Sequence, residues 1–338
     1  MTHLTYLEAA VVGLVQGVTE MFPVSSLGHN VLIPAIIGGS WATDLNVATP
    51  ESPYLAFIVG LHVATAIALL IYFWRDWIRI VGGFFTSIRD RGVRTADQKL
   101  AWMIILATIP VGIVGLLFEH TFRVLFGKPI LAGIFLTVNG LILIAGERYR
   151  SRASLAADAA VAAEPDPRLI PAREPELVGA GRAATGSQAR AGSRVVREQE
   201  QAQAIESDRR LARTTYPQTI LVGSAQILAL LAGISRDGVT MVAGMARGLS
   251  REDAARFAFL LATPVILAAG ALKIPDLLGP LGNGIRGQIV LGSVLSGVGA
   301  YLSVRFLLRY LRTRTLTPFG VYCLIAGVAS VLYLGLVK

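Results

Sequence analysis

The sequence predicts an all-α integral membrane protein, with six transmembrane helices and two re-entrant helix-loop-helix pairs arranged as an inverted repeat. Three observations support this fold class. Hydrophobic residues make up 54% of the 338 residues, charged residues make up only 16%, and the mean hydropathy is +0.60. Six stretches are apolar over a length that can cross a hydrocarbon core, which takes about 20 helical residues. Two further stretches are interrupted by polar loops that contain glycine.

The six predicted spans fall into two halves of the chain. They lie at about 54–74, 98–118 and 129–147 in the first half, residues 1–147, and at about 253–273, 285–308 and 317–337 in the second half, residues 214–338. The net charge of +9 comes from short basic blocks beside these spans, at 75–99, 148–152 and 309–314. Such blocks mark cytoplasmic connections. The basic blocks therefore indicate that the partner is the membrane bilayer itself, and we expect no binding of nucleic acid.

Residues 148–213 differ in composition from the rest of the chain. They are rich in Ala, Arg, Glu and Pro and nearly lack aromatic residues, so they cannot bury enough apolar surface to fold alone. We predict a polar, disordered cytoplasmic linker between the halves, with a solvated helix in its last part, 193–213. No motif in it indicates chemistry.

The two interrupted stretches resemble each other. When Gln16 is aligned with Gln226, two serines and two glycines coincide without gaps: Ser25 with Ser235, and Gly28 with Gly238. The predicted cytoplasmic connections require each stretch to return to the side from which it enters. We therefore predict re-entrant pairs at about 5–37, entering from outside, and at about 218–247, entering from inside. Two opposed broken helices that meet near the midplane are typical of inverted repeats that bind polar ligands. The alternative is two ordinary spans kinked by Gly and Pro.

The first loop gathers polar side chains that are costly at membrane depth. Gln16 and Glu20 share one helix face, and Pro23 ends the half-helix. Two serines, a glycine and an imidazole follow: Ser25, Ser26, Gly28 and His29. Ionisable residues in a membrane are functional candidates, and a hydroxyl beside an imidazole is a minimal nucleophile and base. Helix capping is the alternative for the serines.

The second loop has the composition of a phosphate site. It combines a flexible turn, free amides at a helix start and a guanidinium group, in Gly233, Ser235, Arg236, Gly238 and Thr240. Helix amino termini favour phosphate, and arginine binds phosphate oxygens in a bidentate manner. The alternative for Arg236 is an ion pair with Asp237 or Glu20.

Other polar residues in the spans are interpreted as structural. His62, Asn139 and Gln226 are expected to form single hydrogen bonds between helices, and we leave them outside the site. Ser250 and Asp253 match a variant of the capping box that would open the next span.

At these residues the chain resembles the undecaprenyl-diphosphate phosphatases, also called bacitracin-resistance proteins, over nearly its whole length except the linker. The first family motif is present as Gln16-Gly-Val-Thr-Glu20-Met-Phe-Pro-Val-Ser-Ser-Leu-Gly-His29. The second usually reads Pro-Gly-x-Ser-Arg-Ser-Gly-x-Thr, and here Ala232 replaces the proline and Asp237 replaces the second serine. A Gly-Leu-Ser-Arg-Glu segment follows at 248–252, as in the family.

The resemblance implies hydrolysis of undecaprenyl diphosphate, which recycles the lipid carrier for peptidoglycan synthesis and confers bacitracin resistance. It also implies a bacterial plasma membrane location and a divalent cation, Mg²⁺ or Ca²⁺, on the diphosphate. Our hypothesis assigns chemistry to Glu20, Ser26, His29 and Arg236. Phosphate ligands would be Ser25, Gly28, Gly233, Ser235, Gly238 and Thr240, and metal ligands would be Glu20, Gln16 and Asp237.

In this hypothesis Ser26 attacks the terminal phosphorus, Glu20 and His29 manage its proton and the metal, and Arg236 with loop amides stabilises the developing charge. Attack by His29 itself is the mechanistic alternative. The functional alternative is a transporter that flips a polyprenyl phosphate without hydrolysis, and a noncatalytic scaffold subunit ranks last. The oligomeric state is open, with a homodimer among the options.

Overall fold

The computed structural model describes residues 4–45, 53–126, 128–163, 201–279 and 283–337. These residues form helices joined by turns and contain no strand. The helices are α1 (Tyr6–Met21), α2 (Ser26–Ile37), α3 (Gly39–Asp44), α4 (Pro53–Tyr72), α5 (Trp74–Arg89), α6 (Ala96–Phe126), α7 (Pro129–Ala163), α9 (Tyr216–Ser224), the 3-10 helix η1 (Ala225–Leu230), α10 (Arg236–Ala246), α11 (Arg251–Leu278), α12 (Arg286–Leu311) and α13 (Thr317–Leu336). The predicted all-α class is confirmed.

Several of these helices have the length and composition of membrane spans. Five qualify among the described residues, in α6, α7, α11, α12 and α13. The predicted span at 54–74 corresponds to α4, which meets the same criterion only together with α5, from which it is bent by 85°. The chain is therefore a multi-pass membrane protein.

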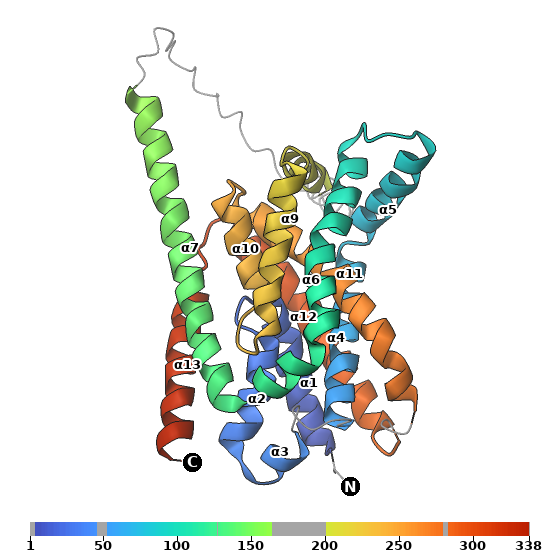
Figure 1. Ribbon diagram of the computed structural model, residues 1–338, viewed down its shortest axis with the longest axis vertical. Coiled ribbons are helices and arrows are strands. Elements are labelled where there is room, and N and C mark those ends of the chain that lie inside the picture. Colours follow the sequence, from blue (N-terminus) through green and yellow to red (C-terminus); the bar gives the residue numbers. More distant parts are fainter. Residues whose placement is uncertain (1–3, 46–52, 127, 164–200, 280–282, 338) are drawn as a thin grey trace, which may run out of the picture.

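Two broken helical elements enter the bundle from opposite ends (Figure 1). Helix α1 rises from the end that holds both termini and turns at mid-height into α2, whereas α9 and η1 descend from the other end and turn into α10. Helix α1 packs on α12 and α9 packs on α6, while α2 and α10 both contact α7. This arrangement places the two turns against each other inside the bundle.

Equivalent caps open these elements. Capping boxes start both: Thr5 with Glu8 in α1, and Thr215 with Gln218 in α9. Ser25 and Ser235 are the N-caps of α2 and α10, and their hydroxyls accept the N–H groups of Gly28 (3.2 Å) and Gly238 (3.1 Å). All of these pairs share the register that aligns Gln16 with Gln226. The predicted cap of α11 is also present, since Ser250 Oγ accepts the N–H of Asp253 at 3.0 Å.

Helix α1 is held in place by close packing of small residues. A Cβ at Gly13 would meet the backbone of Gly292, and one at Gly17 would meet the backbone of Ser296. Small residues four apart allow two backbones to approach closely in a membrane, where packing rather than the hydrophobic effect drives helix association. The polar end of α1 is thereby fixed against α12.

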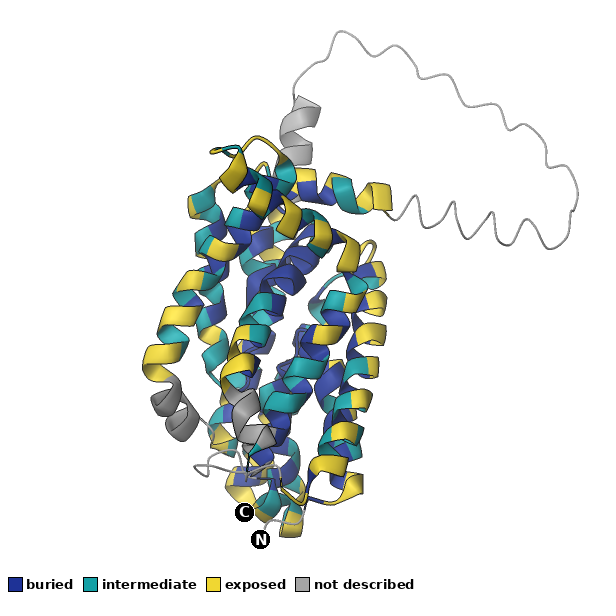
Figure 2. Ribbon diagram, turned by 90° about the vertical axis from the view of Figure 1, so that its right-hand side faces the viewer, coloured by how far each residue is buried: buried dark blue, intermediate teal, exposed yellow. Residues whose placement is uncertain are grey.

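The region predicted as a disordered linker is partly helical. Helix α7 continues to Ala163, past the predicted start of the linker at residue 148, because the Ala- and Arg-rich sequence also favours helix. Disorder of the linker stays a prediction. Residues 164–200 lie outside the described part. A second helical stretch covers 201–211, and Figure 2 shows it lying across the end of the bundle.

The helix at 201–211 is packed, not solvated as predicted. Asp208 is 1% exposed and accepts hydrogen bonds from Arg79 (2.6 Å) and Arg256 (2.9 Å). Burial raises the pKa of the Asp208 carboxyl, and these two arginines oppose the shift. Ser207 also donates to Asp253 at 2.5 Å. The charge of Asp208, which we expected to face water, is instead paired with Arg79 on α5 and Arg256 on α11.

Candidate active site

Glu20 is the centre of the polar cluster where the two turns meet. Its side chain lies in the last turn of α1 and is 7% exposed. One carboxylate oxygen, Oε2, accepts hydrogen bonds from the Ser26 hydroxyl and from Gln16 Nε2 (2.9 Å). The other oxygen, Oε1, lies 2.5 Å from Arg236 Nη2. The predicted carboxylate, hydroxyl and guanidinium are therefore in direct contact, across both loops.

His62 belongs to this cluster, whereas we predicted only a single hydrogen bond between helices for it. Its Nε2 lies 3.3 Å from Glu20 Oε2, and its Nδ1 lies 2.8 Å from the carbonyl oxygen of Ile58. Both ring nitrogens face oxygens that only accept, so the ring satisfies both when it is an imidazolium that donates twice. An ionisable residue within a predicted span was a signal that could have found it.

His29 follows the first loop, and its ring contacts Ser25 and Tyr322. Its Nδ1 is 2.7 Å from the carbonyl oxygen of Ser25, and its Nε2 is 2.8 Å from the Tyr322 hydroxyl. The rings of His29 and Tyr322 are stacked. A neutral ring satisfies both contacts, donating to the carbonyl and accepting from the tyrosine. Among the described residues, its nitrogens thus pair with Ser25 and Tyr322 and not with Ser26.

Ser25 ties the two loops together. Its hydroxyl accepts the N–H of Gly28, within its own loop, and that of Gly233, in the second loop, each at 3.2 Å. Its φ of 68° is unusual for a residue with a side chain and carries a strain cost that surrounding contacts must offset. Gly233 has a φ of 113°, which requires glycine. The hydroxyl predicted to bind phosphate is therefore part of the loop framework.

Asn139, on α7, bridges the two loops. We predicted a single hydrogen bond between helices for it, outside the site. Its Nδ2 donates to the carbonyl oxygen of Pro23 at 2.9 Å, and its Oδ1 accepts the N–H of Ser235 at 3.0 Å. One amide side chain thus sets the distance between the two loops. The prediction of a single bond between helices missed this double role, because it depends on where both loops fold.

The remaining predicted phosphate ligands differ in their geometry. The Thr240 hydroxyl donates back to the carbonyl oxygen of Arg236 at 2.7 Å, which is a bond within its own helix. Ser235 caps that helix, and Gly238 lies against Pro23, where a Cβ would come within 3.2 Å. The guanidinium of Arg236 at the start of α10, 17% exposed in its side chain, is the polar group of the second loop that reaches Glu20.

Asp237 is a buried carboxylate without a hydrogen-bond partner. It is 1% exposed, and neither oxygen has a partner within the described ranges. Its nearest cationic atom is Arg236 Nε, at 3.6 Å, which is itself unpartnered. A buried charge in this state is costly, so the donor chemistry of Asp237 fits a cation.

The described residues hold no group of three or more His, Cys, Asp or Glu side chains that could form a closed metal cage. Magnesium is commonly bound by one or two carboxylates together with substrate phosphates. The unpartnered oxygens of Asp237 fit that pattern, whereas both oxygens of Glu20 already accept from Ser26, Gln16 and Arg236. Gln16 fits less well, because Asn30 donates to its Oε1 at 2.6 Å and its Nε2 donates to Glu20. Both ends of this amide are occupied.

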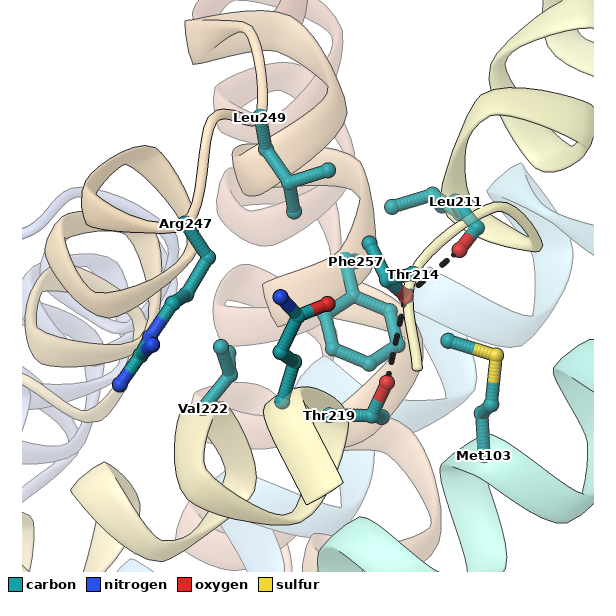
Figure 3. Close-up of a pocket in the computed structure, with 9 residues that line it drawn as sticks. Met103, Leu211, Thr214, Thr219, Val222, Arg247, Leu249 and Phe257 are labelled. Atoms are coloured by element: carbon teal, nitrogen blue, oxygen red, sulfur yellow. Dashed lines mark hydrogen bonds between the residues drawn. The ribbon is translucent and has the colours of Figure 1, made fainter. Parts of the chain in front are cut away.

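A small cavity lies apart from the cluster, between the start of α9 and α11 (Figure 3). Its volume is about 10 Å³, which is room for about one water molecule. Thr214 Oγ1 donates to the carbonyl oxygen of Leu211 at 2.7 Å and lies 3.3 Å from Thr219 Oγ1. We therefore assign this cavity no ligand.

Comparison with known proteins identifies the family. The family model described as "Bacitracin resistance protein BacA" matches residues 9–168 and 170–329. The chain belongs to the BacA family. The resemblance drawn from the two sequence motifs is thereby confirmed, and the contacts around Glu20 are those of a BacA family member.

Relatives in this family match the chain from end to end. A protein named undecaprenyl-diphosphatase from Mycolicibacterium paratuberculosis is 56% identical over 334 residues, 99% of each chain. Undecaprenyl-diphosphatase 2 from Frankia alni is 54% identical over 97% of each chain. Undecaprenyl-diphosphatase 2 from Burkholderia lata is 40% identical, over 93% of this chain and 92% of its own.

Proposed function

We propose that this chain hydrolyses undecaprenyl diphosphate to undecaprenyl phosphate and inorganic phosphate. The relatives of 52–56% identity bear the name of this activity. The observation that carries the proposal is the Ser26 hydroxyl, which donates to Glu20 while Glu20 pairs with Arg236 of the other half. A nucleophile, a base and a phosphate ligand are thus contiguous. The reaction returns the lipid carrier to peptidoglycan synthesis and confers resistance to bacitracin.

In the first step, Ser26 Oγ attacks the terminal phosphorus and its proton passes to Glu20. The bond from phosphorus to the bridging oxygen breaks, and undecaprenyl phosphate leaves with the electron pair. Arg236 stabilises the charge that spreads over the phosphoryl oxygens. Because Arg236 donates to Glu20, we expect it to exchange part of that contact for the phosphate.

In the second step, water attacks the phosphoserine and releases inorganic phosphate, and Ser26 regains a proton. Glu20, which was protonated in the first step, gives that proton back to Ser26 Oγ as the bond from phosphorus to Oγ breaks, and it takes a proton from the attacking water, since it lies beside the same hydroxyl. That second proton then leaves with the phosphate. His62 holds Glu20 from α4. Attack by His29 stays an alternative prediction, and it requires Nε2 to give up its contact with Tyr322.

The divalent cation also stays a prediction. Glu20 and Asp237 would hold Mg²⁺ or Ca²⁺ together with the diphosphate, and the ion would neutralise charge on the leaving phosphate. The unpartnered oxygens of Asp237 support this assignment. We assign Gln16 a framework role. The amides of Gly28, Gly233 and Gly238 with Ser25, Ser235 and Thr240 are proposed to shape the phosphate pocket.

We also propose that α1 with α2, and α9 and η1 with α10, are re-entrant pairs of an inverted repeat with six spans. Their equivalent caps at Ser25 and Ser235 support it, as do their opposite directions of entry in Figure 1. The protein would lie in the bacterial plasma membrane, with the connection 148–213 in the cytoplasm. A homodimer stays a prediction, which cross-linking in membranes would examine.

The test is phosphate release from undecaprenyl diphosphate by purified protein in detergent. Arg236→Ala and Ser26→Ala are each expected to lower kcat/KM at least about a hundredfold, the scale of losing one group that contacts the transition state. Ser40→Ala and Arg314→Ala, which change exposed residues outside the Glu20 cluster, are the matched controls. Near-normal turnover by either site variant would overturn its role.

The same assay separates the alternatives. A phospho-intermediate stable in acid and absent from Ser26→Ala supports serine attack, whereas an acid-labile intermediate absent from a His29→Ala variant supports the histidine. A flippase without hydrolysis releases no phosphate in detergent, where transport cannot occur. Transport of a phosphate also needs no hydroxyl paired with a carboxylate, which is why the Ser26 contact favours the hydrolase.

A further inference from the structure

Helix α5 carries a continuous apolar stripe on the surface of the molecule. The stripe consists of Trp74, Ile78, Val81, Phe85 and Ile88, which are 52%, 64%, 46%, 63% and 54% exposed. At about 3.6 residues per turn, the alternating spacing of four and three residues puts all five on one face. These side chains are too large and too regularly placed to be scattered surface residues.

The opposite face of α5 is fixed against α6. Its buried residues are Asp76, Ile80, Gly83 and Ser87. A Cβ at Gly83 would lie 2.7 Å from the backbone of Asp97, and Trp102 Nε1 donates to the Ser87 hydroxyl at 2.9 Å. Since this face packs backbone to backbone, α5 cannot rotate to bury its stripe within the described bundle.

One flank of the stripe is basic. Arg75 and Arg89 are exposed there, and the Arg75 guanidinium lies 5.2 Å from the centre of the Trp74 ring. The flank on the other side holds Trp77 and Phe84, which pack against the core. The helix therefore presents an apolar face with exposed cations beside it, as do helices that lie in the plane of a membrane surface.

The stripe continues the lipid-facing surface of α4. Ile67 and Ile71, near the end of α4, are 47% and 59% exposed, and Trp74 follows within one turn. The chain then bends by 85° between the two helices. If α4 runs across the bilayer, α5 runs along it, at the end that the basic connections mark as cytoplasmic.

We propose that α5 is an interfacial helix that binds anionic phospholipids of the cytoplasmic leaflet. Its apolar stripe lies at the boundary between headgroups and acyl chains, and Arg75 and Arg89 contact headgroup phosphates. This surface is separate from the Glu20 cluster, and the proposal does not depend on the hydrolytic activity.

The experiment compares two neighbouring labels in the full chain, reconstituted in nanodiscs. Val81→Cys puts a nitroxide on the stripe, and Gly82→Cys puts one about 100° around the helix, on the arginine flank. A Cβ at Gly82 meets nothing within 4 Å, so the label fits there. Cys323 is buried, and the unsubstituted chain measures its background labelling.

In nanodiscs with anionic lipid, the Val81 label should be relaxed by oxygen and shielded from a water-soluble nickel complex, and the Gly82 label should show the reverse. Equal access of nickel to both labels would overturn the proposal. A Val81 label shielded from both reagents, with dipolar broadening between copies, would also overturn it, because a second chain would then cover the stripe.

A lipid titration tests the charge. The Val81 label should move deeper when anionic phosphatidylglycerol replaces neutral phosphatidylcholine, and the double variant Arg75→Gln, Arg89→Gln should lose this response. Two arginines near the surface correspond to a preference of roughly thirtyfold for the anionic surface. Equal depth in both lipids would overturn the recognition of anionic headgroups.

Discussion

Glu20 receives side-chain contacts from α1, α2, α4 and α10, and this number of partners explains how an acid is kept at membrane depth. Two acidic groups, Glu20 and Asp237, lie beside two basic groups, Arg236 and His62. A diphosphate adds more negative charge than Arg236 alone can offset. We therefore expect substrate binding to bring in a cation or to rearrange the carboxylates.

The contact of His62 with Glu20 leads to a prediction about turnover. His62→Leu should lower kcat/KM about tenfold or more, because a hydrogen bond to a charged group contributes about 1.5–3 kcal/mol. His62→Gln keeps an N–H donor near Glu20 and should recover a large part of the loss. Steady-state assays of phosphate release give kcat and KM separately, and the loss should fall mainly on kcat.

Thermal unfolding of the same variants is the control. If His62→Leu unfolds at the wild-type temperature yet turns over slowly, the contact acts on the reaction. An unchanged kcat/KM in the leucine variant would contradict a positioning role for His62.

The unpartnered carboxylate of Asp237 leads to a second prediction. Asp237→Ser restores the residue usual in the family motif, and it should raise the Mg²⁺ concentration for half-maximal activity about tenfold, since one charged ligand is lost. Without added metal, the variant should unfold at a higher temperature, because a buried carboxylate without a hydrogen-bond partner is removed. Metal titrations of activity and of melting temperature measure both effects. An unchanged metal response would exclude Asp237 as a ligand.

At the scale of elements, the site depends on how closely α1 approaches α12. Gly13 and Gly17 leave no space for side chains at this contact, and the last turn of α1 carries Glu20. The loops are joined in the same way, by backbone and amide contacts through Ser25 and Asn139. Packing of small residues thus sets the position of the polar groups.

Gly17→Leu should therefore destabilise the protein by about 1–3 kcal/mol, the cost of overpacking a closely packed contact, and lower its melting temperature in detergent. Gly112→Leu is the matched control, because Gly112 on α6 is exposed and a Cβ there meets nothing within 4 Å. Thermal melts of both variants give the comparison. Equal melting temperatures would show that the α1–α12 contact is not limiting.

At the scale of the whole molecule, the two ends of the bundle differ. One end holds both termini (Figure 1), and the other holds the helix at 201–211, fixed by ion pairs of Asp208. Basic connections gather at this second end, which agrees with a cytoplasmic position. The helices on either side of the long connection are thereby attached to the bundle.

A labelling experiment in intact cells examines this orientation. Cysteine at Ser40, in α3, should react with a membrane-impermeant reagent from outside, whereas cysteine at Arg314, between α12 and α13, should react only after the cells are opened. Both positions are exposed, and Cys323 is buried. Reaction of both from the same side would contradict the proposed topology.

The sequence by itself determined the helical membrane class and the family, and it placed Ser26 and Glu20 close together in one loop. These follow from composition and from residues close together in one loop, where local geometry limits the options. It also indicated Arg236 as a phosphate ligand, because a helix amino terminus and a guanidinium group both favour phosphate.

Only the tertiary structure decided which side chains surround that pair. His62, Asn139 and Tyr322 come from separate helices, and His29 and Thr240 proved to be engaged outside the Ser26–Glu20 contact. The sequence predicted a solvated helix where 201–211 packs on the bundle, and it left the exposed stripe of α5 undecided. The physical reason is the same in each case: a polar group is satisfied by whichever partner the packing of distant helices brings within hydrogen-bond distance, and spacing along the chain does not contain that information.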